Sequence, residues 1–201
     1  MANVAPVRPQ RDPARRAAIL AAAARVFAGS GYAATAVDDV AAAAGITKLI
    51  VYRHFESKEA LYRAVLEGVF QRQAELFVRH MEREGLRAGG TTRALLTVGR
   101  ESPDGFRLLW RHAAREPQFA DYASQFRAVA VRAARAVVTP FLPPELVEWA
   151  AQTLFDHLVD AVLNWLDHGD RALDDDFVAR EAAALQATVA AWAAGEPPAR
   201  A

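Results

Sequence analysis

Apolar residues recur at helical spacing along almost the whole chain, and nowhere do they alternate in the two-residue pattern of a β-strand. The clearest case lies between residues 146 and 165, where apolar side chains fall three and four positions apart. Hydrophobic residues make up 53% of the 201 residues, and much of that share is alanine, the best helix former. Glycines and prolines interrupt the pattern where one helix ends and another begins. The sequence therefore predicts an all-α fold of about nine helices.

Composition and charge exclude several classes of protein. The chain has no cysteine, so it holds neither a disulfide framework nor a thiolate metal site. Its formal net charge is zero, but residues 1–63 carry nine basic side chains against five acidic ones. No apolar run is expected to reach the roughly 18 residues of a membrane span, and we find no signal-peptide core. We therefore expect a cytoplasmic protein with a weakly basic N-terminal part, which is compatible with a module that seeks phosphate groups.

Four helices are expected in the first part of the chain, after a mobile tail at residues 1–11. Each helix begins after a residue that can accept hydrogen bonds from main-chain N–H groups: Asp12, Thr35, Thr47 and Ser57. Glycines separate the first three helices: Gly29, Gly31 and Gly45. Two short helices around a glycine turn, between two longer helices, are typical of a helix-turn-helix motif with a linking helix. We assign residues 12–57 to a DNA-binding domain of three helices.

The third helix carries an apolar pair that packing inside a small domain does not explain. On a helical wheel, Val51 and Phe55 form the face that packs on the preceding helices. Leu49, Ile50 and Arg53 then lie on the opposite side. The major groove of DNA offers them partners, because apolar side chains contact thymine methyl groups and arginine reaches O6 and N7 of guanine. Packing of the apolar pair on the remainder of the same chain is the open alternative.

Polar side chains surround this apolar pair and are suited to the phosphate backbone. Lys48 and Lys58 are the only lysines of the chain, and both flank the third helix. Threonines at helix N-termini add hydroxyl and N–H groups that favour phosphate. The predicted DNA-binding residues are Thr35, Thr47, Lys48, Leu49, Ile50, Tyr52, Arg53, His54 and Lys58.

The stretch ILAAAARVFAGSGYAATAVDDVAAAAGITKLIVYRHFESKEAL, residues 19–61, resembles the DNA-binding domain of TetR/AcrR-type transcriptional regulators. The matching positions are Phe27, Gly31, Tyr32, Thr35, Val40, Ala41, Ala44, Gly45, Thr47, Lys48, Tyr52, His54, Phe55, Lys58 and Leu61. The resemblance implies an all-helical homodimer that binds a palindromic operator, and a C-terminal domain that binds a small ligand and dimerises. Repression is the common mode of such regulators. Many members have glycine or proline at the position of Leu49, so their base preference does not carry over.

Residues 58–195 are predicted to form the larger domain, which the resemblance makes the site of ligand binding and dimerisation. Two long helices, 144–168 and 174–194, are the predicted dimer interface, through Trp149, Leu158, Trp165, Leu185 and Trp192. The aromatic side chains predicted to line a ligand pocket are Phe70, Phe77, Phe106, Trp110, Tyr122, Phe126 and Phe155. Plain core packing is the alternative for each of them. The predicted ligand is small and hydrophobic or aromatic, with Arg111, His112 or Gln125 as a polar anchor, and residues 196–201 form a frayed tail.

Features that would indicate an enzyme are weak. Residues 29–34 match the glycine pattern of a dinucleotide site, but they follow a helical segment instead of a strand. His112 with Glu116, and His157 with Asp160, have helical ligand spacing but no third ligand. We predict no catalytic activity, no metal and no cofactor. The main alternative to a regulator is a helical interaction module or a small-molecule-binding protein without DNA function, and a DNA affinity that falls steeply with salt would separate them.

Overall fold

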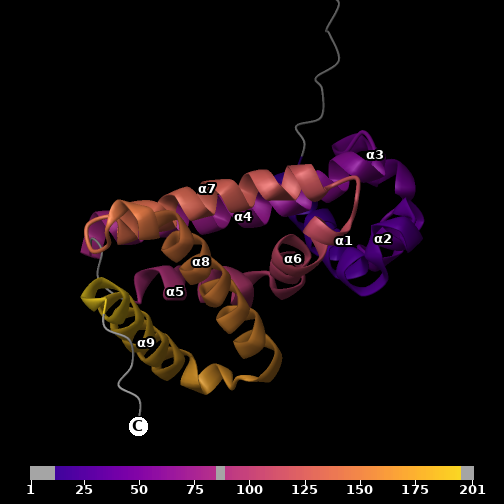
Figure 1. Ribbon diagram of the computed structural model, residues 1–201. Coiled ribbons are helices and arrows are strands. Elements are labelled where there is room, and N and C mark those ends of the chain that lie inside the picture. Colours follow the sequence, from indigo (N-terminus) through magenta and orange to yellow (C-terminus); the bar gives the residue numbers. More distant parts are fainter. Residues whose placement is uncertain (1–11, 85–88, 196–201) are drawn as a thin grey trace, which may run out of the picture. The chain divides into compact units, whose positions relative to one another are not determined.

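The computed structural model describes residues 12–84 and 89–195, and within them the chain is all-α, as predicted (Figure 1). The helices are α1 (Pro13–Ala34), α2 (Val37–Ala43), α3 (Lys48–His54), α4 (Lys58–Glu84), α5 (Gly90–Glu101), α6 (Pro103–Arg107), α7 (Ala120–Val138), α8 (Pro144–His168) and α9 (Asp174–Ala194). Three short helical segments accompany them: η1 (Leu108–His112), η2 (Ala113–Arg115) and η3 (Arg171–Leu173). The predicted tails, 1–11 and 196–201, lie outside the described residues.

The chain divides into two compact units, and the division falls inside α4. Unit 1 is the part up to Val65, and unit 2 begins at Leu66. Unit 1 holds α1, α2, α3 and the start of α4. Unit 2 holds the rest of α4 and all later helices.

Two helix starts of unit 1, those of α1 and α4, have the predicted side-chain caps. Asp12 Oδ1 accepts a hydrogen bond of 3.0 Å from the Ala14 N–H, and Pro13 occupies the first helical position. Ser57 Oγ accepts one of 2.9 Å from the Ala60 N–H at the start of α4. The core of the unit is apolar and comes from all four helices: Ile19, Phe27, Val40, Val51, Leu61 and Tyr62.

The turn between α1 and α2 differs from the prediction. Thr35 does not cap α2, whose N-cap is Ala36, and the Ala36 N–H donates to Asp39 Oδ2 at 2.7 Å. The hydroxyl of Thr35 instead donates to the Gly31 carbonyl at 2.7 Å. Gly31 has a φ of 77° and breaks the helical path inside α1, so this glycine marks a kink where a helix end was predicted.

Helix α1 is the one described helix whose length and apolar composition would allow it to cross a membrane. This corrects the expectation of no such run, because residues 17–34 of this helix hold many alanines and only one charged side chain, Arg25. Ile19, Ala23 and Phe27 on this helix are buried in unit 1. The core helix of a compact domain passes the same test, and α1 is such a helix.

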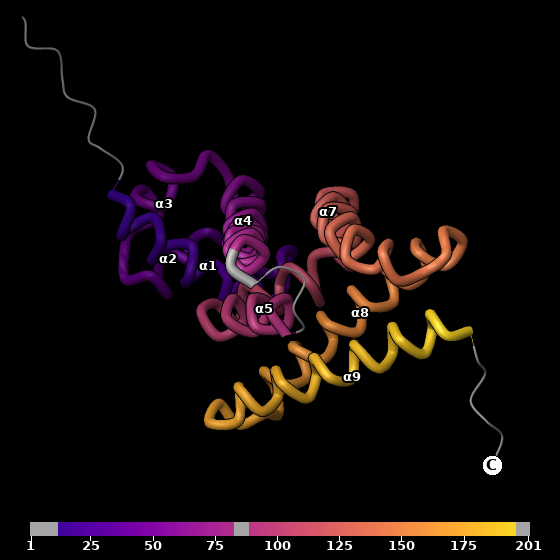
Figure 2. Tube along the Cα trace, turned by 90° about the vertical axis from the view of Figure 1, so that its left-hand side faces the viewer, coloured from indigo at the N-terminus to yellow at the C-terminus, as the bar shows by residue number. Residues whose placement is uncertain are grey.

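Unit 2 is built around α8, which packs against α7 and α5, while α9 packs against α5 (Figure 2). The predicted long helices 144–168 and 174–194 are confirmed as α8 and α9. Asp174 joins them to α5 because its carboxylate accepts hydrogen bonds from the Arg100 guanidinium at 2.7 and 3.1 Å and from Trp165 Nε1 at 2.8 Å. The Arg100 hydrogen bond holds the pKa of Asp174 below its ordinary value. The start of α9 is therefore fixed by a charged network as well as by apolar packing.

Candidate nucleic-acid interface and ligand cavity

Helix α3 presents a mixed apolar and polar surface outside the core of unit 1. Val51 and Phe55 are buried, in agreement with the predicted packing face. Leu49 is 62% exposed and Tyr52 is 44% exposed, while Ile50 is half-buried and Arg53 is exposed. An exposed leucine beside a tyrosine and an arginine on one short helix is the arrangement that base edges and phosphates can contact together.

The two lysines near α3 have different surroundings. Lys48 Nζ lies 2.6 Å from Asp38 Oδ2 on the solvent-exposed surface, and this hydrogen bond raises the pKa of Lys48. Lys58 Nζ points inward and donates to the carbonyls of Tyr32 and Thr35, both at 2.9 Å. It also lies 4.2 Å from the centroid of the Tyr32 ring. Lys58 therefore ties the start of α4 to the end of α1.

The remaining predicted residues divide between surface and core. Thr47 is exposed at the N-cap of α3 but makes no side-chain capping bond. Thr35 is only 2% exposed and its hydroxyl is already engaged, so it does not offer that hydroxyl to phosphate. His54 is half-buried, and its Nδ1 has no hydrogen-bond partner within the described part of the chain.

Unit 2 contains a cavity of about 660 Å³, lined by side chains of α4, α5, α7, α8 and α9. Its volume is that of a small-molecule site. Phe70, Phe77 and Phe155, three of the predicted pocket residues, line it. None of the described lining residues is Asp, Glu, Lys or Arg. The cavity is thus an uncharged, largely apolar space.

The other predicted pocket residues lie elsewhere. Tyr122 contacts Phe126 edge to face, Phe126 contacts Phe70, and Trp110 contacts Phe155 at a ring separation of 5.2 Å. These three residues support the cavity wall without lining it, and Phe106 is buried outside the lining. The predicted anchors Arg111, His112 and Gln125 are absent from the described lining as well. Arg111 forms an ion pair with Asp167 at 2.9 Å, and burial lowers the pKa of His112.

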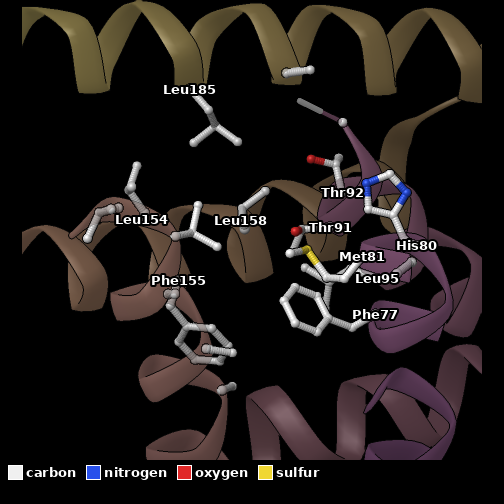
Figure 3. Close-up of a pocket in the computed structure, with 18 of the residues that line it drawn as sticks. Phe77, His80, Met81, Thr91, Thr92, Leu95, Leu154, Phe155, Leu158 and Leu185 are labelled. Carbon is white, nitrogen blue, oxygen red and sulfur yellow. The ribbon is translucent and has the colours of Figure 1, made fainter. Parts of the chain in front are cut away.

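Polar side chains that the sequence did not single out lie at one side of the cavity. Figure 3 shows His80, Thr91 and Thr92 together there, while Leu154 and Phe155 lie across the space and Leu185 faces it from α9. His80 comes from α4, and the two threonines come from the first turn of α5. No spacing in the sequence links a histidine to threonines that are more than ten residues away, so periodicity could not have found them.

Residues 19–65 match a family model described as "Bacterial regulatory proteins, tetR family". Residues 19–65 are therefore similar to the DNA-binding segment of tetR-family regulatory proteins. The HTH-type transcriptional repressor KstR2 of Rhodococcus jostii is 39% identical over 92 residues, 45% of this chain and 44% of that protein. The HTH-type transcriptional activator FasR of Mycolicibacterium smegmatis is 36% identical over 115 residues, 53% of this chain and 50% of that protein. The matches span about half the length of these relatives.

Solved structures extend the similarity to the whole fold. A TetR-like transcriptional regulator from Rhodococcus sp. RHA1 superimposes with a TM-score of 0.75 and 20% sequence identity, over 94% of this chain and 100% of that one. At this level of identity the likeness concerns the fold. The matched family segment contains α3 and its exposed surface.

The predicted dimer residues fall into two groups. Leu158 and Leu185 line the cavity. Trp165 stacks on Phe177 within the chain, at a ring separation of 4.6 Å. Trp149, by contrast, is 49% exposed, and its ring lies 4.5 Å from that of Trp192. A tryptophan pair at the surface of α8 and α9 is the part of the predicted interface that a second chain could cover.

Metal chemistry finds no support in the described ranges. No group of three or more His, Cys, Asp or Glu side chains there is arranged to hold a metal ion. His157 and Asp160 have helical ligand spacing in the sequence, but in the structure His157 contacts Glu181 of α9.

Proposed function

We propose that the chain is a ligand-responsive transcriptional regulator, which binds a palindromic DNA operator as a homodimer and is released by a small, mostly apolar ligand. The observation that carries the proposal is the surface of α3, where Leu49 stands exposed beside Tyr52 and Arg53. The match of residues 19–65 to the tetR family model supports the role in transcription. Repression is the proposed mode, although the relatives include an activator as well as a repressor.

The predicted DNA-binding residues in and beside α3 each have a proposed role. Leu49 and Ile50 contact thymine methyl groups in the major groove, and Arg53 reads a guanine. Tyr52, Thr47 and Lys48 bind phosphates, which fixes the helix in the groove without selecting a base. His54 lies at the edge of this surface, and Lys58 acts indirectly by holding α4 against α1.

The cavity supplies the proposed ligand site, and α4 supplies the connection to the DNA-binding residues. Helix α4 starts at Lys58 in unit 1 and continues into unit 2, where Phe70, Phe77 and His80 line the cavity. A ligand that favours one position of this helix would change the spacing of two recognition helices away from the 34–36 Å of successive major grooves. Affinity for the operator then falls, and by reciprocity operator DNA weakens the ligand by the same factor.

We propose that α8 and α9 form the dimer interface, with Trp149 and Trp192 at its surface. This pair supports the role because Trp149 is exposed, Trp192 is half-buried beside it, and large apolar groups at a surface are stabilised by a partner. A two-fold dimer requires an inverted-repeat operator. In the proposed role the protein acts in the cytoplasm, where the DNA is.

Selection of bound sequences from random duplex DNA by the purified full chain tests the proposal. We expect an enriched inverted repeat whose half-sites are spaced by about one helical turn or a multiple of it, and an affinity that falls steeply with salt. Arg53→Ala, on the exposed face of α3, should abolish the enrichment at one base position of each half-site. The matched control is Arg180→Ala, an exposed arginine on α9. A selection that enriches no sequence would overturn the DNA-binding role and leave a ligand-binding helical protein.

A further inference from the structure

Thr92 is a polar side chain that is fully buried at the wall of the cavity. Its exposed fraction is 0%, and its hydroxyl has no hydrogen-bond partner among residues 12–84 and 89–195. Three other threonines, two at helix C-caps and one inside α9, satisfy their hydroxyls by donating to the carbonyl four residues earlier: Thr35, Thr139 and Thr188. Figure 3 shows the Thr92 oxygen turned towards the cavity. A buried hydroxyl without a partner is costly, and such a group calls for a functional explanation.

The surroundings of Thr92 favour a hydrogen-bond acceptor. Thr92 lies in the first turn of α5, where the main-chain N–H groups of Gly90, Thr91 and Thr92 have no acceptor within the helix. The first bond of this helix runs from the Arg93 N–H to the Gly89 carbonyl, at 2.8 Å. The positive end of the helix dipole therefore meets the cavity beside a hydroxyl that can donate.

His80 closes the same end of the cavity. Its imidazole lies directly against Gly90, where an added Cβ would overlap the ring. Glycine at position 90 therefore lets the side chain of α4 approach the start of α5. Through this contact, α4 and the first turn of α5 form one polar corner of the cavity, made of His80, Thr91 and Thr92.

The remainder of the cavity determines the other part of the ligand. Leu154, Phe155, Leu185 and Phe77 face the space from the other sides. Because none of the described lining residues is Asp, Glu, Lys or Arg, a carboxylate in the cavity would lose its hydration and gain only the partial charge of the α5 N-terminus in return. We infer that the cavity selects an uncharged, largely apolar ligand with one carbonyl-type oxygen, which accepts a hydrogen bond from Thr92. This inference rests on the proposed function, whose ligand it specifies.

Binding of three small probes to the full chain tests this inference. The probes are methyl octanoate, which has a neutral carbonyl, octanoate, which has a charge, and decane, which is of similar length but has no oxygen. We expect methyl octanoate to bind about 5–10-fold more tightly than decane, as one buried hydrogen bond allows. Octanoate should bind more weakly than its ester. Displacement of an environment-sensitive dye from the cavity gives the three dissociation constants.

Variants of α5 test whether the Thr92 hydroxyl causes the preference for methyl octanoate over decane. Thr92→Val should remove the preference for methyl octanoate over decane, while Thr92→Ser, which keeps the hydroxyl, should retain it. Thr97→Val is the matched control, because Thr97 lies on the same helix outside the cavity lining. Equal affinity of the wild type for the ester and decane, tighter binding of octanoate, no binding of any probe, or an unchanged preference in Thr92→Val would each overturn the inference. The proposed function is judged separately by operator selection, which needs no ligand.

Discussion

Removal of the Thr92 hydroxyl should raise the free energy of unfolding of the ligand-free protein. Thr92→Val replaces a fully buried hydroxyl with a methyl group of the same shape. No hydrogen bond is lost, since that hydroxyl has no partner in the described chain. Leaving a buried polar group unsatisfied costs about 1–3 kcal/mol, so the variant should gain about 1–2 kcal/mol of unfolding free energy. For a chain of this size that corresponds to a rise in Tm of roughly 2–8 °C.

The same substitution at Thr35 is the matched comparison. Thr35 is equally buried, but its hydroxyl donates to the Gly31 carbonyl at 2.7 Å. Thr35→Val therefore leaves that carbonyl without this donor, and we expect a loss of about 1–2 kcal/mol. The two variants should move stability in opposite directions although the chemistry of the change is identical.

Denaturant unfolding of the ligand-free proteins measures both effects. All four tryptophans lie in unit 2, so tryptophan fluorescence follows the unit that holds Thr92. Far-UV circular dichroism follows the helices of both units, and so it also reports on unit 1, which holds Thr35. A Thr92→Val protein that is destabilised as much as Thr35→Val would show that the Thr92 hydroxyl has a partner, and the reasoning about the cavity would fail with it.

The remaining predictions concern the DNA surface and the behaviour in acid. Leu49→Ala should change the preference at one base position by roughly 1–3 kcal/mol or less and leave other positions as they were; uniform weakening across sequences would contradict base contact. Asp38→Asn frees Lys48 from its ion pair, so operator binding should tighten several-fold and the salt slope should steepen by about one. An unaltered slope would mean that Lys48 contacts no phosphate. The pKa of Asp174 is lowered in the folded state by the Arg100 hydrogen bond, so its contribution is present above the unfolded pKa of about 3.9 and is lost as pH falls below it. Asp174→Asn should therefore be less stable than the wild type at neutral pH, and the difference should shrink below about pH 4; a constant difference from pH 7 to pH 3 would refute this.

The helices and the exposed face of α3 could be predicted because they depend on residues only a few positions apart. Val51 and Phe55 are one turn apart, so their shared burial follows from helical geometry, and Leu49 then has to lie elsewhere. Asp12 before Pro13 determines the start of α1 in the same local way. The all-α fold and the extents of α8 and α9 rest on such short-range patterns.

Residues whose hydrogen-bond partners depend on the folded path of the backbone could not be assigned from patterns. Thr35 stands where an N-cap is expected, but its hydroxyl bonds to the Gly31 carbonyl and α2 starts after Ala36. Lys58 looks like a surface cation, but its amino group reaches the Tyr32 carbonyl 26 positions earlier. Each of these outcomes depends on which other groups folding brings within hydrogen-bond distance.

The sequence by itself determined where helices form and which face of α3 stays outside the core. Helix formation and amphipathicity act over one or two turns, so the order of residues is sufficient for both. Only the tertiary structure decided what lines the cavity. A cavity is the space left between packed helices, so its polar corner forms where His80 on α4 meets Thr92 on α5. Trp110 and Phe106 are aromatic like Phe77 and Phe155, but they lie outside the lining. Side-chain packing between distant segments, which short-range spacing does not encode, fixed that difference.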